Sequence, residues 1–103
     1  MTYTVLLTRD ARDDLQRLED FLIERALECG DFDLPRRAID AIRTEMRILE
    51  RNPYTCRKVS RDALERELVI PFGGTGYVAL FEIISDHEVV VSALRHQRED
   101  DYH

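Results

Sequence analysis

A short cationic cluster near the end of the chain holds the residues best suited to chemistry. It reads Arg95-His96-Gln97-Arg98, with Tyr102 and His103 shortly after it. A histidine can take up a proton near neutral pH, arginines can stabilise the charge of a reacting phosphate, and a tyrosine can donate a proton to a leaving oxygen. The cluster therefore supplies candidates for phosphodiester cleavage, namely a base, two charge stabilisers and a proton donor: His96, Arg95, Arg98 and Tyr102. Arg66 is a further candidate for stabilising charge.

The surroundings of this cluster are unfavourable to a nucleic-acid substrate. Glu99-Asp100-Asp101 follow it directly, and carboxylates at that position would repel a phosphate. The net charge of −6 and the single lysine, Lys58, also argue against broad attraction to nucleic acid. The same cations can pair with carboxylates of a protein. They are therefore also candidates for binding a protein target (Arg95, His96 and Arg98), while the plainer interpretation is the polar end of a strand.

No motif in the sequence predicts a metal or a cofactor. The histidines and aspartates after residue 95 lack a fixed ligand spacing. Gly73-Gly74-Thr75-Gly76 precedes an expected strand, whereas a phosphate-binding loop precedes a helix. Cys29 and Cys56 flank the second expected helix, which would hold them more than ~20 Å apart, so a disulfide between them is not expected. We therefore expect no metal, no cofactor and no internal disulfide.

The composition predicts one domain covering residues 1–103. A chain of 103 residues with 44% hydrophobic and 35% charged residues can bury one modest core. No apolar run approaches the ~20 residues of a membrane span. The opening MTYTVLLTRD lacks the features of a signal peptide. We expect a cytoplasmic protein in which residues 96–103 form a mobile tail.

The segment from Glu65 to Arg98 predicts a three-stranded antiparallel meander. Its apolar runs are rich in β-branched and aromatic residues, and turn-forming residues separate them. The expected strands contain Leu68-Val69-Ile70, Tyr77 to Ile84, and Val89 to Leu94.

The N-terminal half predicts a strand followed by two helices. Apolar residues alternate from Tyr3 to Leu7, and Thr8 can cap a helix that ends near Gly30. Pro35 suits the first turn of a second helix, which Asn52-Pro53 stops. The result is an α+β fold with a helix hairpin packed on a mainly antiparallel sheet. The position of the first strand in the sheet stays open.

Both faces of the expected meander are apolar, although two helices can cover only one of them. A soluble antiparallel sheet usually has one polar face, so we expect a partner to cover the second face. The residues expected to contact that partner are apolar and come from all three strands: Leu68, Ile70, Phe72, Val78, Leu80, Val90 and Leu94.

The order of elements and three stretches of sequence carry a resemblance to a known family. The stretches are YTVLLTRDARDDL, RELVIPFGGTGYVALFEI and VVVSALRHQREDDY. Together they resemble the RelE/ParE toxin superfamily, and the last two are similar to its ParE-like (plasmid stabilisation) branch. The resemblance implies the toxin of a type II toxin–antitoxin system, with a ParD-like antitoxin as partner and DNA gyrase as target. It implies no specific DNA binding by the toxin alone.

The resemblance leaves alternatives of different classes. A RelE-like toxin would be an enzyme, a ribosome-dependent mRNA endoribonuclease that uses the phosphodiester chemistry described above. A third interpretation is an inactive family member that only binds an antitoxin. The acidic residues after the cluster favour the non-enzymatic, gyrase-inhibiting interpretation.

Overall fold

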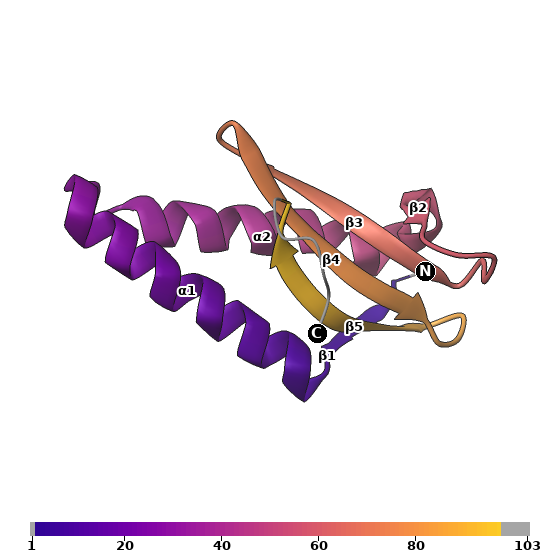
Figure 1. Ribbon diagram of the computed structural model, residues 1–103. Coiled ribbons are helices and arrows are strands. Elements are labelled where there is room, and N and C mark those ends of the chain that lie inside the picture. Colours follow the sequence, from indigo (N-terminus) through magenta and orange to yellow (C-terminus); the bar gives the residue numbers. More distant parts are fainter. Residues whose placement is uncertain (1, 98–103) are drawn as a thin grey trace.

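The computed structural model describes residues 2–97 and has the expected α+β architecture. Figure 1 shows its elements in chain order: β1 (Thr4–Leu7), α1 (Arg9–Cys29), α2 (Leu34–Arg51), the 3-10 turn η1 (Pro53–Thr55), β2 (Arg57–Lys58), β3 (Glu65–Phe72), β4 (Thr75–Ile83) and β5 (Glu88–His96). The three-stranded meander is confirmed as β3, β4 and β5. Because β5 continues through His96, it enters the segment expected to be a tail, and residues 98–103 of that segment lie outside the described residues.

The sheet has five strands in the order β1-β5-β4-β3-β2. The first strand lies beside the last one and is parallel to it, with Val5 opposite Val89. The other neighbouring strands are antiparallel. The position that the sequence left open is thus decided by a contact between the two ends of the chain.

The helix boundaries follow from the expected capping residues. The Thr8 hydroxyl accepts a hydrogen bond from the Ala11 amide at 3.1 Å, which satisfies a free donor of the first turn. Gly30 ends α1 in the left-handed conformation at φ 78°, which glycine adopts without strain. Pro35 lies in the first turn of α2, and Asn52-Pro53 follows its end. None of the described helices contains a stretch long and apolar enough to span a membrane.

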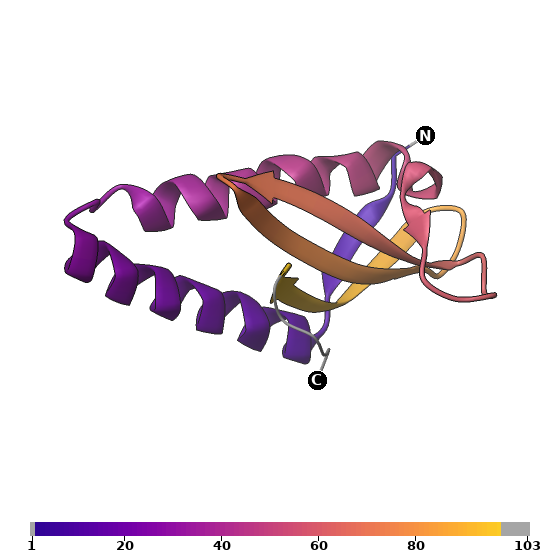
Figure 2. The same cartoon turned by 45° about the horizontal axis from the view of Figure 1, so that its top comes forward.

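The two helices cover one face of the sheet, which we call the covered face. α1 packs mainly on β5 and α2 on β3, and in Figure 1 α2 passes behind β3 and β4. The core between the layers joins helix and strand residues, among them Leu18, Ile42 and Phe81. Figure 2 shows that the joint between the helices lies well beyond the end of the sheet. Within residues 2–97 no helix covers the other face, which we call the open face.

The strand alternation is interrupted once, in β5. Leu80 pairs with Ala93 but Phe81 pairs with Val91, so Ser92 is an extra residue in a β-bulge. An extra residue shifts every later side chain by one position. Val91 therefore faces the helices, and so does Leu94 three positions later.

Candidate functional site

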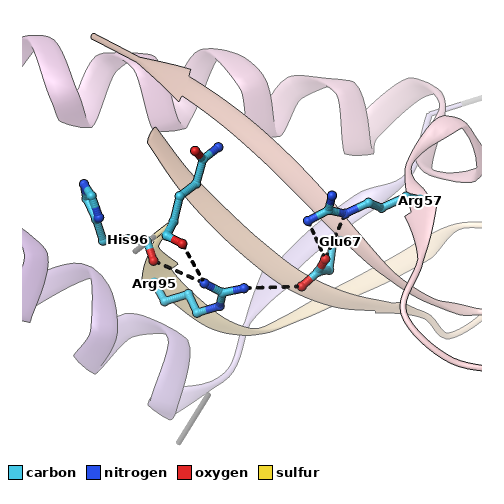
Figure 3. A network of polar contacts seen from close by, with 5 residues as sticks. Arg57, Glu67, Arg95 and His96 are labelled. Atoms are coloured by element: carbon cyan, nitrogen blue, oxygen red, sulfur yellow. Dashed lines mark hydrogen bonds and ion pairs between the residues drawn. The ribbon is translucent and has the colours of Figure 1, made fainter. Parts of the chain in front are cut away.

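The C-terminal end of β5 places two candidate residues on opposite faces of the sheet. Arg95 pairs with Val78, and His96 pairs with Tyr77, a residue of the core on the covered face. Because successive side chains of a strand point to opposite faces, Arg95 points to the open face and His96 to the covered face. Figure 3 shows Arg95 directed toward Glu67 while the His96 ring lies apart from this network. The expected cationic cluster is therefore divided between two surfaces.

On the open face, Glu67 bridges two arginines (Figure 3). Its Oε1 atom accepts a hydrogen bond from Arg57 Nε at 2.9 Å and forms an ion pair with Arg57 Nη2 at 2.8 Å. Its Oε2 atom lies 3.9 Å from Arg95 Nη2. The Glu67 and Arg95 side chains are only 11% and 15% exposed, whereas that of Arg57 is 60% exposed. The carboxylate thus holds a largely buried arginine and an accessible one on the same face of the sheet.

On the covered face, His96 is held at the end of the sheet by two neighbours. Its Nε2 atom lies 3.0 Å from the Thr75 hydroxyl, and its ring meets the Tyr77 ring edge-on at a centroid distance of 5.6 Å. Tyr77 is 4% exposed, and burial raises the pKa of its phenol. The imidazole is therefore a fixed, half-buried group beside an apolar surface.

A groove of about 770 Å³ opens beside His96, between the outer half of α1 and the β3–β4 hairpin. The groove is mainly apolar, and its lining contains arginines but no acidic residue. The residues that line it are Arg17, Leu18, Phe21, Leu22, Arg25, Leu34, Phe72, Gly73, Thr75, Tyr77 and His96. Phe21 is 56% exposed there. A half-exposed aromatic residue between cations suits a protein segment more than a small polar substrate.

The described residues do not bring together the set needed for phosphodiester cleavage. His96 as base and Arg95 as charge stabiliser face opposite sides of the sheet. Arg98 and Tyr102 lie outside the described residues.

Arg66 is a structural residue, so its candidate role in stabilising a phosphate is wrong. It is 8% exposed and donates to the carbonyl oxygens of Ala63, Tyr54 and Cys56 at 2.7 to 2.8 Å. Its guanidinium also lies over the Tyr54 ring, 5.2 Å from the centroid. Arg66 thereby fixes the segment that connects α2 to β3, and its donors are directed at that segment.

Comparison with known proteins identifies the family. Residues 5–101 match the family model described as "ParE toxin of type II toxin-antitoxin system, parDE". The chain belongs to the ParE toxin family. It is a toxin of the RelE/ParE superfamily, which confirms the resemblance found in the sequence.

Relatives and solved structures of both branches are similar to this toxin. "Toxin RelE3" of Caulobacter vibrioides is 35% identical over 89 residues, which cover 86% of this chain and 88% of the relative. The structure of the chromosomal ParDE system from P. aeruginosa shares the fold with a TM-score of 0.70 at 17% identity, covering 92% of this chain and 96% of that chain. The toxin–antitoxin complex RelBE2 from Mycobacterium tuberculosis gives a TM-score of 0.60 at 25% identity, covering 94% and 100%.

Several residues expected on the open face of the toxin lie on the covered face instead, so their placement was wrong. Leu68 and Ile70 pair with Ala79 and Tyr77, and directly opposite residues share a face. Phe72 and Leu94 belong to the same side, Phe72 at the groove and Leu94 in the core.

The bulge at Ser92 explains the error for Leu94, because simple alternation from Val90 would place it outward. The expected residues that do lie on the open face are half-buried or buried: Val78, Leu80 and Val90.

Sequence reasoning missed Asp14 as a buried polar residue. Asp14 is 5% exposed, and its Oδ2 atom accepts a hydrogen bond from the Leu94 amide at 2.9 Å, just after the bulge. A signal was available, because position 14 lies three residues after Ala11 and four before Leu18, on the apolar stripe of α1. The signal for the groove in the sequence is the spacing of Arg17 and Arg25, which places both on one side of α1. Within residues 2–97, metal-binding side chains do not gather in groups of three or more.

Proposed function

We propose that this toxin acts by protein binding, inhibiting DNA gyrase, and that a ParD-like antitoxin neutralises it in the cytoplasm. The observation that carries the proposal is the separation of Arg95 and His96. Acid–base cleavage of RNA requires a base and a charge stabiliser around one phosphate. An arginine held by a carboxylate on an open sheet face supports the recognition of a protein surface instead.

The antitoxin covers apolar surface on the open face in this proposal. Val69 and Ile84 are 37% and 50% exposed, and Leu6 on β1 is 45% exposed. Leu80 lies between these residues on β4 and is half-buried. An antitoxin segment that folds onto this face would bury them, and each buried aliphatic side chain contributes roughly 1.5–3 kcal/mol before ordering costs.

The proposal is tested by inducing the toxin alone in a bacterium. We expect growth arrest with a DNA-damage response while pulse-labelled protein synthesis continues early, and inhibition of gyrase supercoiling by the purified toxin. A halt of translation within minutes, with gyrase unaffected, would indicate that the toxin acts on the ribosome instead. Growth without any defect would indicate an inactive member that only binds its antitoxin.

The target surface is tested by replacing Arg95 and Arg98 with Ala together. We expect the double variant to lose most gyrase inhibition and to keep its affinity for the antitoxin, because the guanidinium groups that pair with target carboxylates are removed. The matched change is His96→Ala, which alters the covered face and should leave gyrase inhibition largely intact. Full toxicity of the double variant at equal expression would show that the C-terminal end of β5 takes no part in target binding.

The antitoxin surface is tested separately with Leu80→Asp. A carboxylate on the open face should weaken antitoxin binding by about tenfold or more, because a charge would be desolvated in the interface. Arg43→Asp, an exposed change on α2, serves as the control. Leu94→Asp would place the charge in the core and test folding instead.

The second candidate is a RelE-like ribosome-dependent endoribonuclease. The 35% identity to a protein named Toxin RelE3 favours keeping it. In that case His96, Arg95, Arg98 and Tyr102 would be the residues to replace, with mRNA cleavage on ribosomes as the measurement.

A further inference from the structure

The groove on the covered face carries a regular pattern of charge along α1. Arg17, Phe21 and Arg25 follow at intervals of four residues, and all three line the groove. Residues four apart lie on the same side of a helix, and eight residues span roughly 12 Å. An exposed aromatic ring is thus flanked by two guanidinium groups. Asp14 lies 3.9 Å from Arg17 and offsets part of its charge, so Arg25 is the stronger cation for a ligand.

The same chain exposes a segment with the opposite pattern. Asp31-Phe32-Asp33 forms the joint between the helices, and Phe32 is 73% exposed. Asp31 pairs with Arg37, and Asp33 lies 3.4 Å from Arg36, but these carboxylates are 45% and 68% exposed. Exposed ion pairs contribute little free energy, so both carboxylates can be redirected to other cations at small cost.

The two features lie at the same end of the molecule. Leu34 lines the groove and follows the acidic joint directly, and Leu27, which is 70% exposed, lies near the end of α1. This end of the helix hairpin lies beyond the sheet (Figure 2), where a second molecule can approach it. When a groove and its complementary segment are adjacent, a two-fold arrangement allows each molecule to fill the groove of the other.

We propose that the toxin free of antitoxin associates with a second copy of itself, with Phe32 of each molecule inserted into the groove of the other. In this arrangement Phe32 packs against Phe21 and the apolar floor, Asp33 faces Arg25 of the other copy, and Asp31 faces Arg17. This inference does not depend on the target of the toxin. It gives the free toxin a means of burying Phe21 and Phe32, the exposed aromatic residues at the groove and at the joint.

The test is the oligomeric state of purified toxin refolded without antitoxin, measured by sedimentation over a range of concentrations at 0.1 and 0.5 M NaCl. We expect a dimer for the wild-type chain. Phe32→Ser should weaken it by about 30-fold or more and Arg25→Glu by about tenfold at low salt, with a smaller effect of Arg25→Glu at high salt. Leu27→Ser is the matched control, because it removes an equally exposed apolar side chain that does not line the groove.

A charge exchange makes the test specific. Asp33→Arg alone should also weaken the dimer, and combining it with Arg25→Glu should restore most of the affinity, because the opposite charges again face each other across the interface. A wild-type chain that stays monomeric at 0.1 mM, or a dimer that Leu27→Ser disrupts as strongly as Phe32→Ser, would overturn the proposal. Loss of antitoxin binding in Phe21→Asp, with a monomeric free toxin, would assign the groove to the antitoxin instead.

Discussion

Asp14 and Glu67 are carboxylates held against opposite faces of one sheet, and they serve different purposes. On the covered face, Asp14 is 5% exposed and accepts a main-chain hydrogen bond from Leu94. On the open face, Glu67 accepts a hydrogen bond from Arg57 and approaches Arg95. The first carboxylate is part of the core, whereas the second organises side chains that a partner can reach.

The difference between the two carboxylates indicates where substitutions in this toxin affect stability and where they affect binding. Asp14 satisfies an amide beside the bulge, and the bulge determines which later residues of β5 face the helices. Glu67 holds guanidinium groups on the face that we propose to bind partner proteins. Variants on the covered face should therefore act on stability, and variants on the open face should act on binding.

The largest effect is expected from inserting one alanine between Ala93 and Leu94, which would break the distinction between the faces. With one more residue after the bulge, Leu94 would turn to the open face and Arg95 into the core, unless the strand shifted as a whole. Exposing a buried leucine costs about 2–5 kcal/mol and burying an unpaired charge costs more, so we expect a largely unfolded chain. Urea unfolding followed by circular dichroism measures this.

The control for the insertion is Ser92→Ala, which keeps the bulge and the length of β5. It removes only a long hydrogen bond from the serine hydroxyl to the Leu80 carbonyl at 3.4 Å. We expect a loss below about 1 kcal/mol. An insertion variant as stable as Ser92→Ala would mean that the strand register after the bulge does not determine the faces.

A smaller effect is expected from removing Asp14 and Arg57, one residue on each face. Asp14→Ala should lower the free energy of unfolding by about 1–3 kcal/mol, because the buried Leu94 amide loses its acceptor. Arg57→Ala should lower it by about 1 kcal/mol or less, because its side chain is 60% exposed and solvent screens its ion pair with Glu67. Chemical denaturation of both variants measures the difference.

Asp13→Ala provides the reference for the first change. It alters an exposed neighbour on the same helix and should change stability by less than about 0.5 kcal/mol. Equal losses in Asp14→Ala and Arg57→Ala would show that the two faces do not differ in the way described.

The smallest effect is expected at alkaline pH, from Tyr77 on the covered face. Burial raises the pKa of this phenol in the folded state, so the folded protein keeps a proton that the unfolded chain loses. Stability is therefore complete below the unfolded-state pKa of about 10 and falls as the pH rises toward the folded pKa. Tyr77→Phe should lose less stability than the wild-type chain between pH 9 and 11. An identical decline in both proteins would contradict a buried, un-ionised phenol.

The sequence by itself determined the two helices with their ends, the first strand and the meander. Thr8, Gly30 and Pro35 lie at the ends of the helices as expected, because caps act through hydrogen bonds and dihedral angles of neighbouring residues. The meander and its glycine hairpin were equally predictable from apolar runs and turn residues. The same stretches were sufficient to identify the toxin family.

Only the tertiary structure decided which surfaces these elements form. Cross-strand register and the bulge at Ser92 placed Leu68 and Leu94 under the helices and separated Arg95 from His96. The pairing of β1 with β5 and the contact of Asp14 with Leu94 join residues about 80 positions apart. Local periodicity carries no information about such contacts, since they depend on how distant segments bury apolar surface together.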